Sequence, residues 1–186
     1  TDYVFDGNKE GVYEVDDIRN PASVYGESKK EAEDLVLAYD KSFVVRTSWV
    51  YGYNGHNFVK TMLKLAQTRD SLDIVGDQVG SPTYTVDLAV LLCDMIDSEN
   101  YGVYHGTNED FCSWADFALK IFDYTNKSII VNSIPTSEYP TKANRPLNSI
   151  LNKKKLLENN FKLLPTWQDA LKRYLKELGE MKQWKY

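Results

Sequence analysis

Two residues whose side chains could exchange a proton with a substrate, Tyr25 and Lys29, stand four positions apart at the start of a helical pattern. This spacing places both side chains on one face of a helix. A free phenol titrates near ~10, and an ammonium group held beside a phenol makes it a stronger acid, closer to working pH. Such a pair can give a proton to a sugar or alcohol oxygen, or accept one from it.

The spacing alone is weak evidence, because the chain has 13 Tyr and the pair could be a packed aromatic residue followed by a solvated lysine. Two other segments favour the chemical interpretation. Residues 1–7 indicate a strand that runs out into a turn, with a hydroxyl group at Thr1. Residues 46–52 end a second buried strand with further hydroxyl and aromatic groups.

Alternating strand and helix patterns must position these residues, and they indicate an α/β fold. We expect strands at 1–5 and 42–48 that flank a helix starting near Ser23, so that the two strands pair in parallel through a right-handed crossover. The polar loop 6–20 should lie over the mouth of the site. Later helices are expected at 57–68, 86–96, 114–124, 152–158 and 166–178, and later strands at 72–75, 102–106 and 128–131.

Composition excludes several classes of protein. The chain of 186 residues is 42% hydrophobic and 26% charged, as in a soluble globular protein, and no apolar run approaches the ~20 residues of a membrane helix. A net charge of −5 argues against nucleic acid as a general partner. It does not argue against a nucleotide-sugar, because a diphosphate needs only one or two local cations.

The cysteine and histidine content predicts no metal site and no disulfide framework. Cys93 and Cys112 have no neighbouring Cys or His at metal-ligand spacing, and we expect both to be small buried residues in a reducing compartment such as the cytoplasm. His56 and His105 are too far apart in sequence to suggest a metal pair. We therefore predict that no metal is bound.

Six blocks in order resemble the dTDP-4-dehydrorhamnose reductases, a family within the extended branch of the short-chain dehydrogenase/reductase superfamily. They extend over most of the chain, from residue 1 to the blocks near residue 149, and the resemblance continues to about residue 175. The blocks are Thr1-Asp2-Tyr3-Val4-Phe5-Asp6-Gly7, Tyr25-Gly26-Glu27-Ser28-Lys29, Arg46-Thr47-Ser48-Trp49-Val50-Tyr51, Asn57-Phe58-Val59-Lys60-Thr61-Met62-Leu63, Asp77-Gln78-Val79-Gly80-Ser81-Pro82-Thr83 and Arg145-Pro146-Leu147-Asn148-Ser149.

The resemblance implies part of a Rossmann-type parallel sheet with a smaller α/β substrate lobe. We expect residues 1–52 to be the remaining half of the NAD(P)-binding domain, 53–84 to belong to the substrate lobe, 85–108 to return to the sheet and 109–186 to complete the lobe. The sequence contains no Gly-x-Gly-x-x-Gly turn after a strand, where a dinucleotide-binding fold holds its phosphates. We therefore expect the chain to be the C-terminal two-thirds of a reductase, inactive by itself.

The resemblance also implies the catalytic and cofactor-binding residues. Tyr25 would be the general acid, Lys29 its helper and a ligand of the nicotinamide ribose, and Thr1 the hydroxyl that holds the carbonyl oxygen of the substrate. Thr47 and Ser48 follow a strand at the edge where the nicotinamide of NADPH or NADH should lie. Thr1 could instead be a strand-end threonine chosen for β propensity.

Four residues are candidates for substrate binding, each with a structural alternative. Tyr3 and Trp49 could support a sugar or base on their aromatic faces, or pack in the core. Asn57 resembles the family residue that meets the substrate diphosphate, but a helix-capping role would suffice. Arg145 could bind a phosphate with two hydrogen bonds, or form a surface salt bridge.

The resemblance implies reduction of the C4 ketone of dTDP-4-dehydro-L-rhamnose to dTDP-L-rhamnose, a precursor of bacterial surface polysaccharide. Two alternatives stay open. One is a reductase or epimerase acting on another nucleotide-sugar. The other is a non-catalytic regulatory subunit on the same fold, resembling the methionine adenosyltransferase beta subunit. A homodimer is compatible with the sequence, which does not decide the oligomeric state or the choice between NADPH and NADH.

Overall fold

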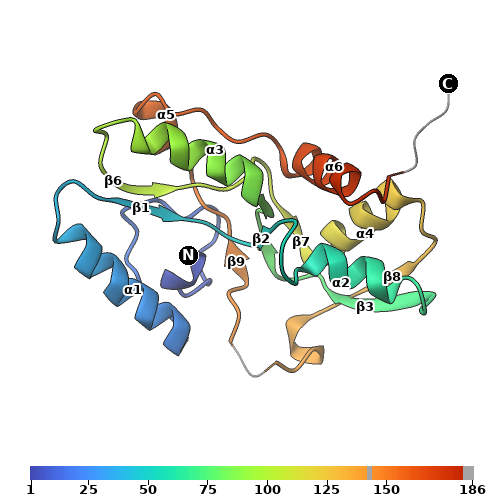
Figure 1. Ribbon diagram of the computed structural model, residues 1–186. Helices are drawn as coiled ribbons and strands as arrows, with labels where there is room; N and C mark the ends of the chain where they lie inside the picture. Colours follow the sequence, from blue (N-terminus) through green and yellow to red (C-terminus); the bar gives the residue numbers. More distant parts are fainter. Residues whose placement is uncertain (142–143, 182–186) are drawn as a thin grey trace.

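The computed structural model describes residues 1–141 and 144–181, so a few positions of the expected 109–186 segment lie outside the described residues. Helices and short strands alternate along the chain and gather in two groups, which lie side by side in Figure 1. The predicted α/β class is confirmed, with parallel pairing in most strand pairs.

The first group holds the helix that carries Tyr25. Its elements are α1 (Val24–Leu37), β1 (Phe43–Arg46), α3 (Thr85–Ile96) and β6 (Gly102–His105). Strands β1 and β6 pair in parallel, with α1 on one side of them and α3 on the other (Figure 1). Within the described residues β1 pairs with β6 alone, and three of its four residues are only half-buried, which is less burial than we predicted.

The expected strand at 1–5 is wrong. Residues Asp2–Val4 form a short 3-10 helix, η1, because the Thr1 side chain accepts a hydrogen bond from the Tyr3 amide and caps a tight turn. The predicted parallel pairing of 1–5 with 42–48 is therefore absent. A backbone hydrogen bond of 3.1 Å from the Asp2 amide to the Thr47 carbonyl joins the two segments. Val4 and Phe5 are nevertheless buried, as a core segment should be.

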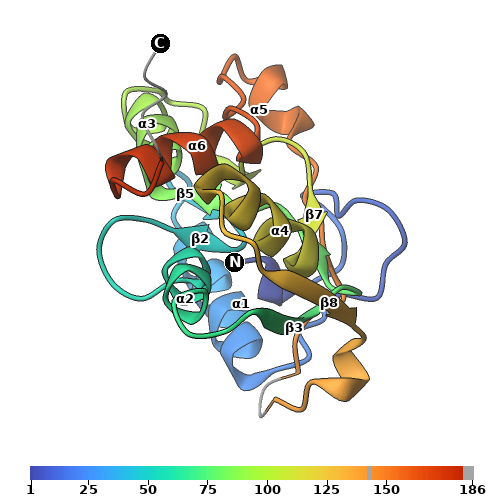
Figure 2. The same cartoon turned by 90° about the vertical axis from the view of Figure 1, so that its right-hand side faces the viewer.

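The second group is the larger core. It consists of α2 (Phe58–Leu65), β3 (Ser71–Val75), α4 (Trp114–Thr125), β8 (Ile130–Ile134) and α6 (Trp167–Glu177). Strands β3 and β8 pair in parallel over five residues, and the faces of α2, α4 and α6 that carry apolar residues pack together. Figure 2 shows α4 between α6 and this strand pair.

Short strands join the two groups. β2 (Val50–Tyr51) pairs with β5 (Thr83–Tyr84), and β4 (Val79–Gly80) lies between β7 (Cys112–Ser113) and β9 (Asn148–Ser149). Two small helices, η2 (Thr136–Glu138) and α5 (Lys154–Glu158), complete the described chain. Segments far apart in sequence thus meet between the groups, which is where a site can form.

Helix starts agree with the predicted caps, because side-chain acceptors there satisfy amides that have no partner within the helix. Ser23 accepts from the Gly26 amide at 3.1 Å, Asn57 from the Lys60 amide at 3.0 Å, and Ser113 forms a capping box with Asp116. The stop of α6 at Gly179 is also confirmed, with a left-handed φ of 73° at that glycine.

The prediction for the cysteines is half wrong. Cys112 is buried, but Cys93 is exposed on the outer face of α3, a helix whose apolar sequence suggested burial all round. Across residues 1–141 and 144–181, no helix combines the length and apolar character needed to cross a membrane. In the same residues, no group of three or more His, Cys, Asp or Glu side chains is arranged to hold a metal ion.

Candidate active site

The Tyr25–Lys29 pair lies on α1, with the Lys29 Nζ atom 5.7 Å from the centre of the Tyr25 ring. The Tyr25 ring packs edge-on against Tyr3 with 5.5 Å between ring centres, and half of the side chain stays exposed. The helix can approach this closely because Gly26 has no side chain. A Cβ atom there would lie 2.3 Å from the Tyr3 carbonyl oxygen. The phenol thus stands at the surface of the site, next to the residues of η1.

Beside this pair lies a buried carboxylate that the sequence did not single out. Asp2 is 5% exposed, and its Oδ1 atom accepts a hydrogen bond of 3.0 Å from the Thr1 hydroxyl, while Oδ2 has no partner. Burial raises the pKa of the Asp2 carboxyl above its ordinary value of 3.8, and the nearby hydroxyls of Ser149 and Thr1 oppose part of that rise. A buried acceptor without a partner is costly, so Asp2 Oδ2 is a candidate to receive a hydrogen bond from a ligand.

Asp2→Asn is expected to raise the melting temperature at pH 7. Because the pKa of Asp2 in the folded protein lies above 3.8, the folded state binds more protons than the unfolded state between these two values, and stability falls as pH rises through that window. The neutral amide removes this loss. The difference in melting temperature between variant and parent should therefore be present at pH 7 and vanish toward pH 3.8, as thermal unfolding across pH will test.

The catalytic activity of Asp2→Asn should fall, although its stability rises, because the amide presents one acceptor oxygen where the carboxylate presents two. A hydrogen bond to a charged group is worth about 1.5–3 kcal/mol, so kcat/KM should fall by roughly 10- to 100-fold. A variant that gains stability and keeps the parent kcat/KM would show that Asp2 does not contact the substrate.

The end of β1 supplies a second open polar atom. The Thr47 hydroxyl is buried without a hydrogen-bond partner, at the strand end where sequence reasoning placed the nicotinamide. The Ser48 hydroxyl, by contrast, donates to the Ser81 carbonyl at 2.9 Å and is committed within the protein. Of the two predicted cofactor-binding hydroxyls, that of Ser48 is engaged within the protein and that of Thr47 has no partner there.

A cavity opens next to η1, and a second one adjoins it. The smaller, about 160 Å³, is lined by Asp2, Tyr3, Trp49, Gln78, Trp114, Arg145, Pro146 and Ser149. The larger, about 730 Å³, lies along α2 and β3, is mostly apolar, and shares Gln78, Trp114 and Arg145 with the smaller one. Its volume falls within the range of about 300–1,000 Å³ that is usual for small-molecule sites.

Two stacked tryptophans line the smaller cavity, and one of them, Trp114, also lines the larger. The rings of Trp49 and Trp114 lie 3.6 Å apart and nearly parallel, with 9° between their planes. Trp49 adopts a left-handed φ of 49°, which is uncommon for a bulky residue, and its ring lies on Gly80, where a Cβ atom would come within 2.8 Å. Contacts with Trp114 and Gly80 thus fix the Trp49 ring in the lining of the smaller cavity.

The other two candidates for substrate binding occupy different situations. Arg145 is exposed and lines both cavities, so its guanidinium lies where the two spaces meet. Asn57 is not among the lining residues of either cavity. Its Oδ1 atom caps α2, and its Nδ2 atom donates to the Gly52 carbonyl and the Tyr174 hydroxyl, both at 2.9 Å. The structure therefore shows the capping role for Asn57.

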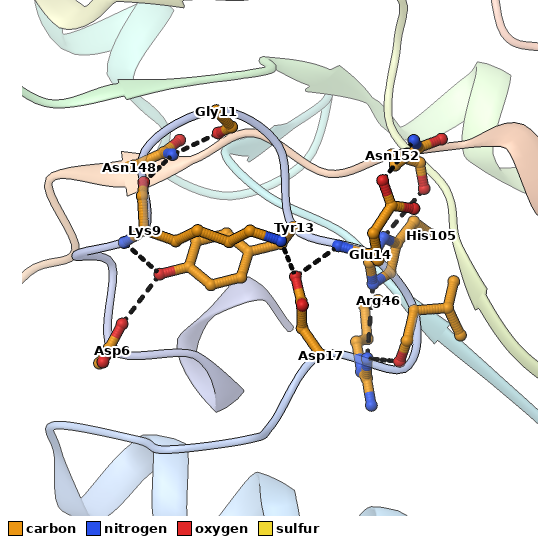
Figure 3. A network of polar contacts seen from close by, with 11 residues as sticks. Asp6, Lys9, Gly11, Tyr13, Glu14, Asp17, Arg46, His105, Asn148 and Asn152 are labelled. Atoms are coloured by element: carbon orange, nitrogen blue, oxygen red, sulfur yellow. Dashed lines mark hydrogen bonds and ion pairs between the residues drawn. The ribbon is translucent and has the colours of Figure 1, made fainter.

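The loop 6–20, expected over the mouth of the site, runs along residues 148–152. Asn148 Nδ2 donates to the carbonyls of Lys9 and Gly11, and the backbones of Tyr13 and Asn152 also bond across (Figure 3). Gly7 lies against Pro146 of the smaller cavity, with a left-handed φ of 78° and no room for a Cβ atom. The loop thus supports the segment that carries Arg145.

The structure thus places the tyrosine–lysine pair of the sequence blocks at the start of α1, as the resemblance to the extended short-chain dehydrogenases/reductases implies. The chain belongs to the RmlD substrate binding domain family, whose model matches residues 1–180. The family predicted from the six sequence blocks is confirmed by this match.

Relatives with known names agree with it. The dTDP-4-dehydrorhamnose reductase of Aggregatibacter actinomycetemcomitans is 47% identical, over 92% of this chain and 63% of the relative. A crystal structure of the Bacillus anthracis dTDP-4-dehydrorhamnose reductase in complex with NADP is 42% identical with a TM-score of 0.91, over 95% of this chain and 63% of that chain. The orthologue from Clostridium acetobutylicum is 43% identical with a TM-score of 0.93, over 96% and 64%. The chain thus spans slightly less than two-thirds of these proteins.

Proposed function

We propose that the protein containing this chain reduces the C4 ketone of dTDP-4-dehydro-L-rhamnose to dTDP-L-rhamnose. The observation that carries the proposal is the placement of the Tyr25–Lys29 pair near two buried polar atoms that have no hydrogen-bond partner, Asp2 Oδ2 and the Thr47 hydroxyl oxygen. Relatives that bear the name of this reductase support it.

In the proposed reaction, the Tyr25 phenol donates its proton to the C4 oxygen as negative charge develops there. The Thr1 hydroxyl, which caps η1 and donates to Asp2 Oδ1 in the structure, would turn from Asp2 to orient that oxygen. The Lys29 ammonium stabilises the phenolate that remains. NADPH or NADH, when bound, supplies the hydride.

The residues present fit one end of such a cofactor. The unpartnered Thr47 hydroxyl can bond the nicotinamide end, and Lys29 can bond the adjacent ribose from α1. The Gly-rich turn that would hold the phosphates is absent from these 186 residues. Supporting the proposal, the Bacillus anthracis relative was crystallised with NADP.

We assign the sugar to the smaller cavity and the nucleotide to the larger one. Asp2, Tyr3 and Trp49 line the smaller cavity beside Tyr25, so the reacting carbon belongs there. The larger cavity offers apolar walls from α2 and β3 for a base. Arg145, at the junction, is placed for the diphosphate, which a guanidinium binds through paired hydrogen bonds.

The partner in this proposal is a dTDP-sugar, and the whole protein would work in the cytoplasm as a monomer or homodimer. The two free cysteines are compatible with a reducing compartment.

The test is NADPH oxidation by the full-length gene product, followed by absorbance and by identification of the product. Oxidation with dTDP-4-dehydro-L-rhamnose, and slower oxidation with other 4-keto nucleotide-sugars, is expected. Oxidation faster with another sugar would move the assignment to that substrate. Tight cofactor binding without oxidation of any of them, together with activation of a partner enzyme, would instead indicate the regulatory subunit.

A further inference from the structure

A buried ion pair joins α1 to the end of β1. Arg46, the last residue of β1, is 3% exposed, and Glu33, on the inner face of α1, is 6% exposed. The Arg46 Nε atom lies 3.0 Å from Glu33 Oε1, and Nη2 lies 2.9 Å from Oε2, so the two planar groups meet through paired hydrogen bonds. Such a fork accepts one relative orientation, which a single-point contact does not require.

The remaining contacts of Arg46 extend the pair to three more segments (Figure 3). Its Nη1 atom donates to the Val15 carbonyl at 2.8 Å and lies 3.4 Å from His105 Nε2 on β6. His105 Nδ1 is 3.0 Å from the Asn152 carbonyl, which can only accept, so Nδ1 carries the proton and Nε2 is free to accept from Arg46. Burial and the Arg46 charge lower the pKa of His105 to about 3, which keeps the ring neutral at pH 7.

Both partners lie next to the groups proposed to act on the substrate. Glu33 follows Lys29 by one helical turn and Tyr25 by about two, so a rotation of α1 that Glu33 permits would move both side chains. Arg46 immediately precedes Thr47, whose carbonyl accepts the Asp2 amide beside Thr1. The ion pair therefore connects the helix that carries the phenol to the strand end that carries the hydroxyl groups.

We propose that the Arg46–Glu33 pair is a positioning device for proton transfer, which fixes the rotation of α1 and so the distance from the Tyr25 hydroxyl to the substrate oxygen. This inference rests on the proposed function. A buried ion pair is commonly no more stabilising than an apolar pair of similar volume, because both charges must lose their water. What an apolar pair does not supply is the directional fork. The pair therefore contributes mainly the orientation of α1 relative to β1, and less the stability of the fold.

The test compares the full-length parent with Arg46→Met, with Arg46→Met/Glu33→Leu, and with Glu33→Asp. The measurements are the melting temperature, NADPH affinity, kcat, KM and the primary isotope effect with C4-deuterated NADPH. Arg46→Met leaves the buried Glu33 carboxylate with only the longer contact of 3.3 Å to Arg19 Nη1, and should lower the melting temperature strongly. The double variant should regain most of that loss, yet keep kcat about 10- to 100-fold below the parent, since small misplacements of reacting groups cost this much.

In the double variant, KM and NADPH affinity should change less than about threefold, and the isotope effect should rise as chemistry becomes slower. Glu33→Asp keeps both charges but withdraws the carboxylate by one methylene, and should lower kcat with a smaller loss of melting temperature than Arg46→Met. The matched control is Glu31→Gln, which removes an exposed charge from the same helix and should leave kcat unchanged.

A double variant, or Glu33→Asp, that folds and turns over at the parent rate would overturn the proposal, because the pair would then be structural alone. If the parent itself shows no turnover with any 4-keto nucleotide-sugar, the proposed function fails and this inference fails with it. If the parent turns over substrate and the variants have the same kcat as the parent, only the positioning role is rejected.

Discussion

Tyr25→Phe is expected to lower kcat for the reduction by roughly 10²- to 10⁴-fold, the contribution usual for a positioned general acid. The substitution removes the hydroxyl and keeps the ring, which packs edge-on against Tyr3. Because half of the side chain is exposed, the fold should not change. NADPH oxidation at saturating dTDP-4-dehydro-L-rhamnose measures the effect, and binding of the sugar nucleotide by calorimetry should stay within about threefold of the parent.

The matched control is Tyr39→Phe. Tyr39 follows α1 directly, is 65% exposed and lies two turns or more beyond Lys29, so its hydroxyl has no part in the proposed chemistry. Lys29→Met should lower kcat in a second, smaller step, because the ammonium that stabilises the phenolate is lost. If Tyr25→Phe retains more than about a tenth of the parent kcat, another group must donate the proton.

Local signals account for what the sequence predicted well. A residue with a capping side chain precedes three of the helical patterns, namely Ser23, Asn57 and Ser113. Because a cap acts within three residues, these helix starts can be predicted without any tertiary information. The Tyr25–Lys29 contact follows from helix periodicity alone. The family blocks added the chemical roles, which spacing by itself would not have given.

Features that depend on contacts between distant segments could not be predicted from the sequence. Asp2 and Trp114 were missed because burial beside a cavity depends on what packs around a residue, and their neighbours are supplied by segments near 49, 78 and 145–149. An aromatic residue within the predicted helix 114–124 gave no sign that it would stack on Trp49. The hydrogen bond that the Tyr3 amide donates to the Thr1 hydroxyl likewise favours η1 over the strand that β propensity predicted.

Asn57 shows why one motif can support two interpretations. An asparagine that caps a helix and one that binds a diphosphate look the same in a sequence. In the structure, both amide atoms are engaged by Lys60, Gly52 and Tyr174. The capping role was therefore predictable from the position of Asn57 before a helix. That its side chain is held by Tyr174 of α6, away from the cavity lining, depends on how the helices pack and could not be predicted from the sequence.

A polypeptide of these 186 residues alone is expected to show no NADPH oxidation, although it contains Tyr25, Lys29 and Thr1. The chain supplies the nicotinamide end of the site but no glycine-rich turn for the cofactor phosphates. Without phosphate contacts, binding energy for the dinucleotide is lost and the hydride is not held at the sugar carbon. Calorimetry should detect the sugar nucleotide at the described cavities and no tight NADPH binding.

The same polypeptide is expected to self-associate. Within the described residues β1 pairs on one side only, and large apolar side chains are exposed on both flanking helices, with Leu35 78% exposed on α1 and Ile96 76% exposed on α3. An open strand edge between apolar helix faces is prone to pairing with another chain. Light scattering coupled to size-exclusion chromatography, with the full-length gene product as control, measures this. A monodisperse 186-residue chain that oxidises NADPH would refute both expectations, and would mean that the phosphate-binding half is dispensable for turnover.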